Sequence, residues 1–266
     1  MKTLITGGSG FLAGYLRALV PGADAPSRAE LDVTDDCSVV GDYDRVFHLA
    51  AQTSPRRAEK DPLETTMVNV NGTRNVLEAL KPGAVMVFVS TCHVYGLPRF
   101  LPVTEDHPLA PRGVYASSKL AAERVVAERA IVVRPFNFTG LGQPQDLALA
   151  EWAEQGRRGQ SRIRCGNVGL SRDYLDVRDV AAGVLLLAER GRAGEAYNLC
   201  SGVPRKLVDL LRLVSGGEPE PDPARWRQHA APVLYGSANK AQALGWSPAV
   251  PLERTLAQLR SPRDRP

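Results

Sequence analysis

A phenol and an amine stand four residues apart in segment 115–119, as Tyr115 and Lys119. On a helix this spacing places both side chains on one face. A nearby cation lowers the pKa of a tyrosine from its usual value near 10, so Tyr115 could exchange a proton with a substrate oxygen at neutral pH. Thr91 follows an apolar stretch, and its hydroxyl could hydrogen-bond the same oxygen. These residues predict hydride and proton transfer at a carbonyl; the alternative is an exposed Tyr–Lys pair without a catalytic role.

A glycine-rich turn occurs near the start of the chain, where residues 6–13 fit the pattern Gly-x-x-Gly-x-x-Ala between a strand and a helix. Gly7 permits a sharp turn, Gly10 lets the backbone approach a pyrophosphate, and Ala13 permits close packing of the helix on the strand. The pyrophosphate would bind the amides at the helix N-terminus. The alternative is a glycine turn that holds no ligand.

Two charged residues after this turn bear on which dinucleotide binds. Asp32 lies at about the distance at which an acid takes the adenosine ribose of NAD. Segment 31–35, however, fits better as the segment that follows a later strand, near the adenine. The second strand would then be the short Ala23–Pro26, and Arg28 after it could hold the 2′-phosphate of NADP. Arg28 as a plain surface charge is an equal alternative, so NADP(H) and NAD(H) both stay open.

Strands and helices alternate along the first half of the chain. Apolar segments 2–6, 45–50, 84–90 and 130–134 are expected as strands, and segments 11–20, 63–80 and 115–129 as helices. This alternation predicts an α/β fold with a doubly wound, Rossmann-like parallel sheet. The carboxyl ends of its strands would face the ligand, which places the glycine turn and Thr91 at the same edge.

The pattern loosens after Asn137, and proline and glycine gather at 140–144 and 216–223. We expect a dinucleotide-binding lobe over residues 1–137. Residues 138–266 are expected to form mainly a smaller, mixed substrate-binding lobe, with segments near 170–200 returning to the first lobe. Residues 179–189 and 206–213 are its clearest helices.

Composition excludes several classes of protein. The 266 residues are 44% hydrophobic and 23% charged, as in ordinary globular proteins. The longest apolar run is Val184–Ala188, too short for a membrane span, and the first residues do not resemble a signal peptide. A net charge of +4 without a basic tract argues against nucleic-acid binding. Four scattered cysteines without metal-ligand spacing are expected as reduced thiols of a cytoplasmic protein that binds no metal.

Eight segments occur in a characteristic order, namely 6–12, 48–51, 69–73, 94–96, 115–119, 134–137, 172–174 and 176–180. Together they resemble the extended short-chain dehydrogenases/reductases, the group of nucleotide-sugar epimerases, dehydratases and reductases. Three further segments, 135–140, 197–202 and 244–248, most resemble the reductases of 4-keto-6-deoxyhexoses within that group.

The resemblance implies roles for matching positions, and with the residues discussed above it gives the expected site. Thr91, Tyr115 and Lys119 would be catalytic. The expected cofactor contacts are Gly7, Gly10, Phe11, Leu12, Arg28, Asp32, Val33, Leu49, Ala50, Ala51, Tyr115 and Lys119. The expected substrate contacts are Thr91, Cys92, His93, Asn137, Arg172 and Arg227. Arginine suits a diphosphate because its planar fork binds phosphate oxygens bidentately, although each arginine could instead form an ordinary salt bridge.

The chain departs from the family pattern at three places. His93 stands two residues after Thr91, where dehydratases of the group have an acid, and this disfavours removal of water. Residues 228–230, after Arg227, differ from the related reductases, which leaves the nucleotide open. The chain is also shorter than typical members near residues 23–27.

The resemblance therefore implies a reductase that transfers hydride from a nicotinamide cofactor to a 4-keto group on a nucleotide-activated 6-deoxyhexose, while Tyr115 supplies the proton. One alternative is a nucleotide-sugar 4-epimerase that keeps NAD bound; another is a catalytically silent dinucleotide-binding sensor. The expected partner is a nucleotide sugar, with no nucleic acid and no membrane. The resemblance also suggests a homodimer through the helices near 63–80 and 115–129.

Overall fold

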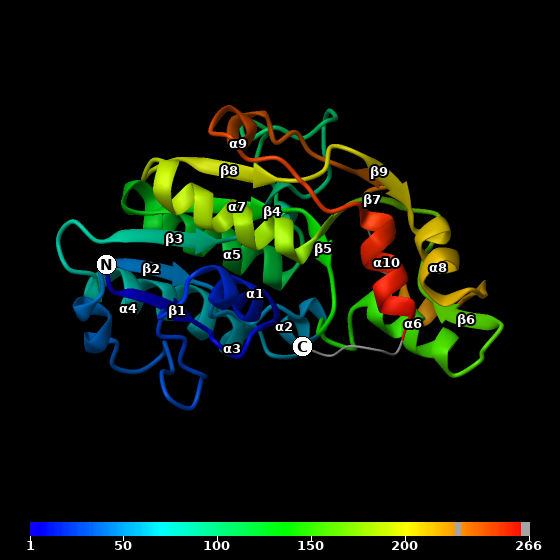
Figure 1. Cartoon of the computed structure of the whole chain (residues 1–266), viewed down its shortest axis with the longest axis horizontal. Helices are drawn as coiled ribbons and strands as arrows, with labels where there is room; N and C mark the ends of the chain where they lie inside the picture. The colour runs from blue at the N-terminus through cyan, green and yellow to red at the C-terminus, as the bar shows by residue number, and fades with distance from the viewer. Residues whose placement is uncertain (227–229, 262–266) are drawn as a thin grey trace.

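Five parallel strands form the central sheet of the computed structural model, which describes residues 1–226 and 230–261. They are β1 (Thr3–Thr6), β2 (Arg45–His48), β3 (Val85–Val89), β4 (Ile131–Pro135) and β8 (Ala196–Leu199), in the order β1-β2-β3-β4-β8. Every neighbouring pair is parallel. Helices cover both faces, so the predicted doubly wound α/β class is confirmed (Figure 1).

Alternate strand residues point to opposite faces of this sheet, and each face has its own helices. Ile5 and Val87 pack with α1 (Phe11–Leu19) and α7 (Val177–Arg190). Leu4 and Met86 pack on the other face with α4 (Gly72–Ala79) and α5 (Val114–Val126). Burial on both faces explains why the central strand β3 is apolar throughout.

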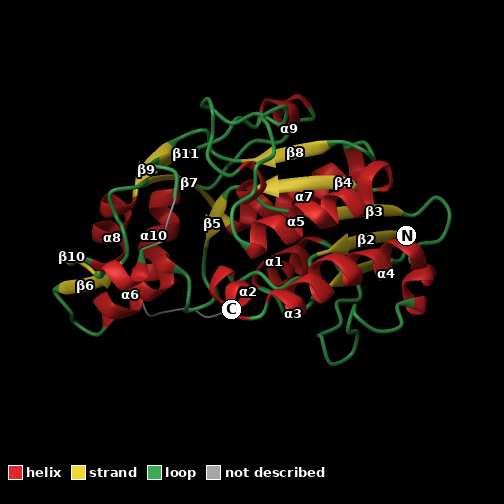
Figure 2. Ribbon diagram, turned by 180° about the vertical axis from the view of Figure 1, so that it is seen from behind, coloured by secondary structure: helices red, strands yellow, loops and turns green. Residues whose placement is uncertain are grey.

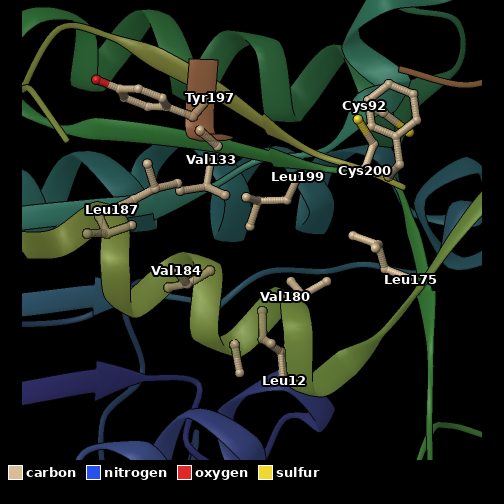
Figure 3. Close-up of a cluster of buried hydrophobic side chains, with 14 of the residues drawn as sticks. Leu12, Cys92, Val133, Leu175, Val180, Val184, Leu187, Tyr197, Leu199 and Cys200 are labelled. Atoms are coloured by element: carbon tan, nitrogen blue, oxygen red, sulfur yellow. The ribbon is translucent and has the colours of Figure 1, made fainter. Parts of the chain in front are cut away.

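Figure 3 shows the contact that fixes α7 on the sheet: Val180, Val184 and Leu187 point toward Val133 of β4 and Leu199 of β8.

On the opposite face, α3 (Pro62–Thr66) continues through a π-helical turn, Met67–Asn71, into α4. The predicted helix 63–80 is therefore one continuous helix with a wider turn in its middle. The short α2 (Pro55–Lys60) precedes it.

The sheet ends at β1, because the expected strand Ala23–Pro26 is reduced to one bridge between Leu4 and Asp24. Ile5 N donates to Asp24 O at 2.8 Å, and Asp24 N donates to Thr3 O at 3.0 Å. Pro26 lacks an N–H and cannot donate the next bond of the ladder, although its carbonyl accepts from Gly8 N at 2.9 Å. The expectation that a later strand precedes segment 31–35 is also wrong, since residues 27–34 contain turns and no strand. Leu31 and Val33 pack against the core, but no backbone pairing with β1 is formed here.

The remaining elements build a smaller, mixed region. Helices α6 (Ala148–Arg157), α8 (Leu207–Ser215) and α10 (Leu252–Arg260) pack around a separate apolar cluster, beside the parallel pair β6 (Arg162–Cys165) and β10 (Glu218–Pro221). Strand β7 (Ser171–Asp176) pairs with β5 (Asn137–Thr139), β9 (Pro204–Lys206) and β11 (Val233–Leu234). Figure 2 shows these strands between the central sheet and the three helices. Short helices complete the fold at Ser38–Asp42, Cys92–Tyr95, Ala127–Arg129, Pro223–Arg225 and Asn239–Ala243.

No helix in the described ranges is both long and apolar enough to cross a membrane. Nor do the described residues bring three His, Cys, Asp or Glu side chains into a group that could hold a metal ion. All four cysteines are buried and unpaired.

Candidate active site

Two hydroxyl groups meet where β3 ends. Thr91 caps the short helix Cys92–Tyr95 by accepting a hydrogen bond from His93 N at 3.2 Å. The Thr91 hydroxyl also hydrogen-bonds the phenol of Tyr115, which lies in the first turn of α5. Since Thr91 directly follows the carboxyl end of β3, the pair lies at that edge of the sheet.

Lys119 lies one turn further along α5 and is only 3% exposed. Its amine stands over the Phe88 ring, 4.1 Å from the ring centroid. Burial lowers the pKa of Lys119 to about 7, against the opposing charge of Glu123. Burial also raises the pKa of Tyr115 to about 12, although the hydrogen bond with Thr91 lowers it. The expected lowering of the Tyr115 pKa is therefore wrong for this state, because desolvation outweighs any effect of the lysine, and Tyr115 is a protonated phenol.

A buried ion pair behind Lys119 was missed by the sequence analysis. Glu123 binds Arg134 of β4 through two hydrogen bonds, of 2.7 Å from Nη2 and 3.1 Å from Nε, and accepts a further one from the Ser90 hydroxyl. Arg134 also donates to the Tyr95 hydroxyl at 3.0 Å. Two signals could have revealed the pair: an arginine within an otherwise apolar strand, and an acid four residues after Lys119.

The glycine turn forms a cradle at the end of β1. Gly7 has φ +70°, and a Cβ atom there would lie 2.9 Å from the Cα and N of Ala50. Gly10 N donates to Gly7 O at 2.9 Å and precedes α1, whose first amides receive no cap from a described side chain. Free amides at a helix N-terminus and a backbone without Cβ atoms fit the diphosphate of a dinucleotide.

The residues predicted to line the cofactor next to this turn differ in what they can offer. Leu12 is buried in the core, so only its backbone amide faces the turn. Phe11 is half-buried and stacks on Phe138 with ring centroids 5.9 Å apart. The half-buried stretch 49–51, which contains Leu49, Ala50 and Ala51, follows β2 directly beside Gly7.

Arg28 and Asp32, the two candidates for recognising the adenosine, pair with each other. Arg28 Nε donates to Asp32 at 2.9 Å and Arg28 Nη1 donates to Glu64 at 3.3 Å, while the Arg28 side chain stays 62% exposed. Asp32 also accepts hydrogen bonds from the amide and hydroxyl of Thr34. Val33 is buried against Gly72 and packs the segment onto α4. Both alternatives for cofactor recognition thus lie in one exposed cluster.

Cys92 and His93, both expected at the substrate, lie in different surroundings. The Cys92 side chain is 2% exposed within the hydrophobic core, and burial raises the pKa of its thiol to about 12. Cys92 packs in the core and offers little surface to a ligand, so its expected substrate contact stays a prediction. His93 is half-buried, and its ring centroid lies 6.3 Å from that of Tyr115, at the edge of the same site.

Arg172 and Asn137 lie on the neighbouring strands β7 and β5. Arg172 Nη1 donates to Ser171 O at 2.7 Å and to Ala231 O at 2.8 Å. Its charge lowers the pKa of the Cys92 thiol, which places Arg172 near the Thr91 end of the site. Asn137 Nδ2 donates to Asp173 O at 3.1 Å.

The two acids that follow Arg172 on β7 have contacts of their own. Asp173 accepts from the amides of Ser201 and Gly202 at 2.8 and 2.9 Å, whereas Asp176 binds Arg178. Arg227, the remaining expected substrate contact, lies outside the described residues. The glycine cradle after β1, Thr91 after β3, and the phenol and buried amine of α5 together suit proton transfer to a carbonyl beside a bound dinucleotide.

The sequence of this chain is similar to those of known proteins. The sequence pattern of the NAD dependent epimerase/dehydratase family matches residues 3–200. GDP-6-deoxy-D-mannose reductase of Pseudomonas aeruginosa is 34% identical, and the match covers 98% of this chain and 96% of that protein. GDP-6-deoxy-D-talose 4-dehydrogenase of Aggregatibacter actinomycetemcomitans is 28% identical over 80% of this chain and 79% of its own length.

A solved structure gives the corresponding result in three dimensions. The structure of RMD from Pseudomonas aeruginosa complexed with NADPH superimposes with a TM-score of 0.87 at 32% identity. The match covers 98% of each chain. The similarity therefore extends over both the central sheet and the smaller mixed region.

Proposed function

This chain belongs to the NAD dependent epimerase/dehydratase family, and from that membership we propose that it reduces the 4-keto group of GDP-4-keto-6-deoxy-D-mannose or a closely related nucleotide-activated 6-deoxyhexose. The family resemblance, the oxidoreductase class and the nicotinamide cofactor, NAD(H) or NADP(H), expected from the sequence are confirmed by the comparisons. The choice of this reaction within the family rests on the site.

One observation carries the proposal: Tyr115 is a protonated phenol, hydrogen-bonded to Thr91 and one helical turn from buried Lys119. Reduction of a ketone needs an acid that starts with its proton, and a phenol with a pKa of about 12 meets this need. Removal of water would need a carboxylate near the sugar, and the corresponding position holds His93. The site therefore favours reduction over dehydration.

The residues of the chain divide the work of reduction. Nicotinamide supplies the hydride when the cofactor is bound at the glycine cradle. Thr91 and Tyr115 bind the carbonyl oxygen through their hydroxyl groups and orient the carbonyl. Tyr115 gives its proton to that oxygen, and the protonated fraction of Lys119 stabilises the phenolate that is left. The buried surroundings of Lys119 exclude water and strengthen this charge interaction.

Three further points belong to the proposal. Arg172 and Asn137 would bind the sugar nucleotide, and the names of the two relatives support GDP as its nucleotide. The relative solved with NADPH supports NADPH as the reductant. Residues 1–137 would bind the cofactor, while most of 138–266, apart from segments near 170–200, would bind the substrate.

We also propose a homodimer and a cytoplasmic location. Leu63 and Met67 expose 74% and 41% of their surface on the helix that runs from α3 into α4. This helix and α5 would form the dimer interface, which light scattering can test against a Leu63→Glu variant.

The cytoplasmic location is supported by the four cysteines, which are all buried and unpaired. Free thiols fit a reducing compartment.

A panel assay tests the reaction. Purified protein is mixed with GDP-, dTDP- and UDP-linked 4-keto-6-deoxyhexoses, and oxidation of NADPH and NADH is followed by absorbance. The proposal expects NADPH consumption with the GDP sugar and no NAD retained through purification. A 4-epimerase would instead retain NAD and convert sugars without net cofactor consumption. A sensor would bind the dinucleotide without turning over any sugar.

A further inference from the structure

His48 is a buried polar side chain at the end of β2 to which the mechanism assigns no role. Its ring is 1% exposed and lies between two threonine hydroxyls. Nδ1 is 2.8 Å from Thr6 Oγ1, and Nε2 is 3.0 Å from Thr73 Oγ1. Thr6 precedes the glycine cradle directly, whereas Thr73 lies on α4.

The hydrogen bonds around His48 fix which nitrogen carries the proton. Thr73 Oγ1 lies 2.7 Å from the carbonyl oxygen of Asn69, which can only accept, so the single hydroxyl proton of Thr73 goes there. Nε2 of His48 must then donate to Thr73. With Nε2 protonated, a neutral ring leaves Nδ1 as an acceptor, and Thr6 donates to it while accepting from Ala50 N at 3.2 Å.

The result is a one-directional chain in which every donor has one acceptor. It begins at the amide of Ala50, beside the glycine cradle, and passes through Thr6, His48 and Thr73 to the carbonyl of Asn69. Of the two neutral tautomers, only the one protonated at Nε2 satisfies all of these bonds.

The Asn69 end of the chain contacts the catalytic helix. The Asn69 amide group accepts from Gln52 N at 2.7 Å and donates to Ser118 Oγ at 2.8 Å. Ser118 in turn donates to the carbonyl oxygen of Tyr115 at 2.8 Å. His48 thus stands midway between the cofactor cradle and the turn of α5 that carries the catalytic phenol.

We propose that His48, as a neutral ring protonated at Nε2, is a positioning residue that couples the cofactor-binding turn to the catalytic helix. Through Thr6 it holds Ala50 against Gly7, and through Thr73 it holds Asn69 against α5. Loss of the distal hydroxyl, on Thr73, therefore loosens the cofactor cradle although Thr73 itself does not line it. The coupling deepens the proposed function, but its effect on cofactor binding does not depend on the identity of the sugar substrate.

Two further observations support a ring that is neutral and fixed in place. Burial and the charge of Lys119 lower the pKa of His48 to about 3, so the ring stays neutral at physiological pH. The His48 ring also stacks on Phe88, with centroids 5.9 Å apart, and the same aromatic ring carries the Lys119 amine. A displaced His48 would therefore disturb the support of the catalytic lysine.

A double-mutant cycle on cofactor affinity tests the coupling. NADPH and, in parallel, NADH are titrated into the full chain, with Kd measured by fluorescence, for Thr6→Val, Thr73→Val and the double variant. Each single variant should weaken binding by about 3- to 10-fold, the usual worth of one hydrogen bond. The double variant should be little weaker than either single one, because both changes interrupt the same chain. Thr73→Ser keeps the hydroxyl and should restore the wild-type Kd.

Thr255→Val is the matched control. Thr255 is equally buried, and its hydroxyl donates to Asp176 at 2.6 Å in the smaller region. This change should lower the melting temperature while leaving the cofactor Kd and the rate of ketone reduction unchanged. An unchanged Kd in Thr73→Val, or a double variant whose loss is the product of the two single losses, would overturn the coupling.

A spectroscopic measurement needs no variant and so avoids any failure to fold. The ¹⁵N shifts of His48 in the wild-type protein distinguish the two neutral tautomers and the charged ring. The proposal expects Nε2–H, and an Nδ1–H or charged ring at pH 7 would contradict it. If the sugar panel shows no turnover but the cycle shows coupling, the proposed function fails while the positioning role stands.

Discussion

Two charge clusters of the site are built in contrasting ways. Behind the catalytic helix, Glu123 and Arg134 pair at 2.7 Å with side chains only 6–7% exposed. At the β1 edge, Arg28 pairs with Asp32 at 2.9 Å, but the arginine side chain is 62% exposed. Breaking a buried pair typically costs about 3–5 kcal/mol, whereas an exposed pair is worth about 0–1 kcal/mol.

This difference in burial separates the part of the site that must stay rigid, around Tyr115, from the part that can adapt, around Arg28. Proton transfer depends on small distances between Thr91, Tyr115 and the substrate oxygen, so the groups behind them are buried and fully hydrogen-bonded. The adenosine end of a cofactor lies far from the reacting atoms. An edge without its second strand, held by surface ion pairs, can therefore change its cofactor preference without disturbing the chemistry.

Removal of the catalytic phenol should give the largest effect. Tyr115→Phe takes away the proton for the carbonyl oxygen while leaving the ring, so kcat for ketone reduction should fall about 10²- to 10⁴-fold. Tyr43→Phe is the matched control at the β1 edge, where the Tyr43 phenol donates to Asp24 at 2.8 Å. Its kcat should stay within about twofold of wild type, since the hydrogen bond that is lost lies away from the chemistry. Near-normal turnover by Tyr115→Phe would refute the assignment.

The two clusters can be compared directly by the same substitution. Glu123→Gln leaves Arg134 buried without its carboxylate and should lower the free energy of unfolding by about 3–5 kcal/mol. Glu64→Gln, at the exposed cluster, should cost less than about 1 kcal/mol. Urea denaturation measures both. Equal losses in the two variants would show that burial does not distinguish the clusters.

Arg172 tests whether binding at a remote group contributes to the reaction. Arg172→Ala should raise KM for the GDP sugar about 10- to 150-fold, as expected for charged hydrogen bonds to a diphosphate. Arg172→Lys should recover only part of this, because an ammonium is not bidentate. Melting temperature is measured on the same variants. A destabilised Arg172→Ala with an unchanged KM would assign the arginine to structure alone.

Regular elements of the fold were predictable because their sequences carry local signals. Strand 84–90 is apolar throughout, and the glycine pattern at 6–13 marks the first turn. The lost strand at 23–26 was harder to predict, because a single backbone bridge to Leu4 depends on the neighbour and leaves little trace in the sequence.

Within the site, residue types were easier to predict than their electrostatic state. The spacing of Tyr115 and Lys119 correctly indicates a shared helix face, but burial sets the direction of both pKa shifts, and burial is a property of the packed protein. The burial of Cys92 was missed for the same reason. The partners of His48 come from three separate segments, which no single motif unites.

The depressed pKa of Lys119 predicts how activity depends on pH. The ammonium form stabilises the phenolate, and this form is lost as pH rises through about 7. Since Tyr115 stays protonated up to about pH 12, kcat/KM should be level below pH 7 and fall about tenfold per pH unit above it. Glu123→Gln removes a charge that raises the Lys119 pKa, so the decline should move to lower pH. A profile that is level from pH 6 to 9 would exclude Lys119 as the titrating group.

The smallest effect is expected at the exposed cluster, where Arg28 and Asp32 are predicted to contact the cofactor. A 2′-phosphate on Arg28 would gain a charged contact, but Arg28 would give up part of its pairing with Asp32 and Glu64. The net loss of NADPH affinity in Arg28→Ala should therefore be only about 3- to 10-fold, with NADH unaffected.

The variant Asp32→Asn separates the two interpretations of this cluster. If Arg28 binds the 2′-phosphate, loss of the Asp32 charge frees the arginine and lowers the Kd for NADPH. If Asp32 binds the ribose, the variant raises the Kd for NADH instead. Equal Kd changes for the two cofactors in both variants would remove the cluster from cofactor recognition.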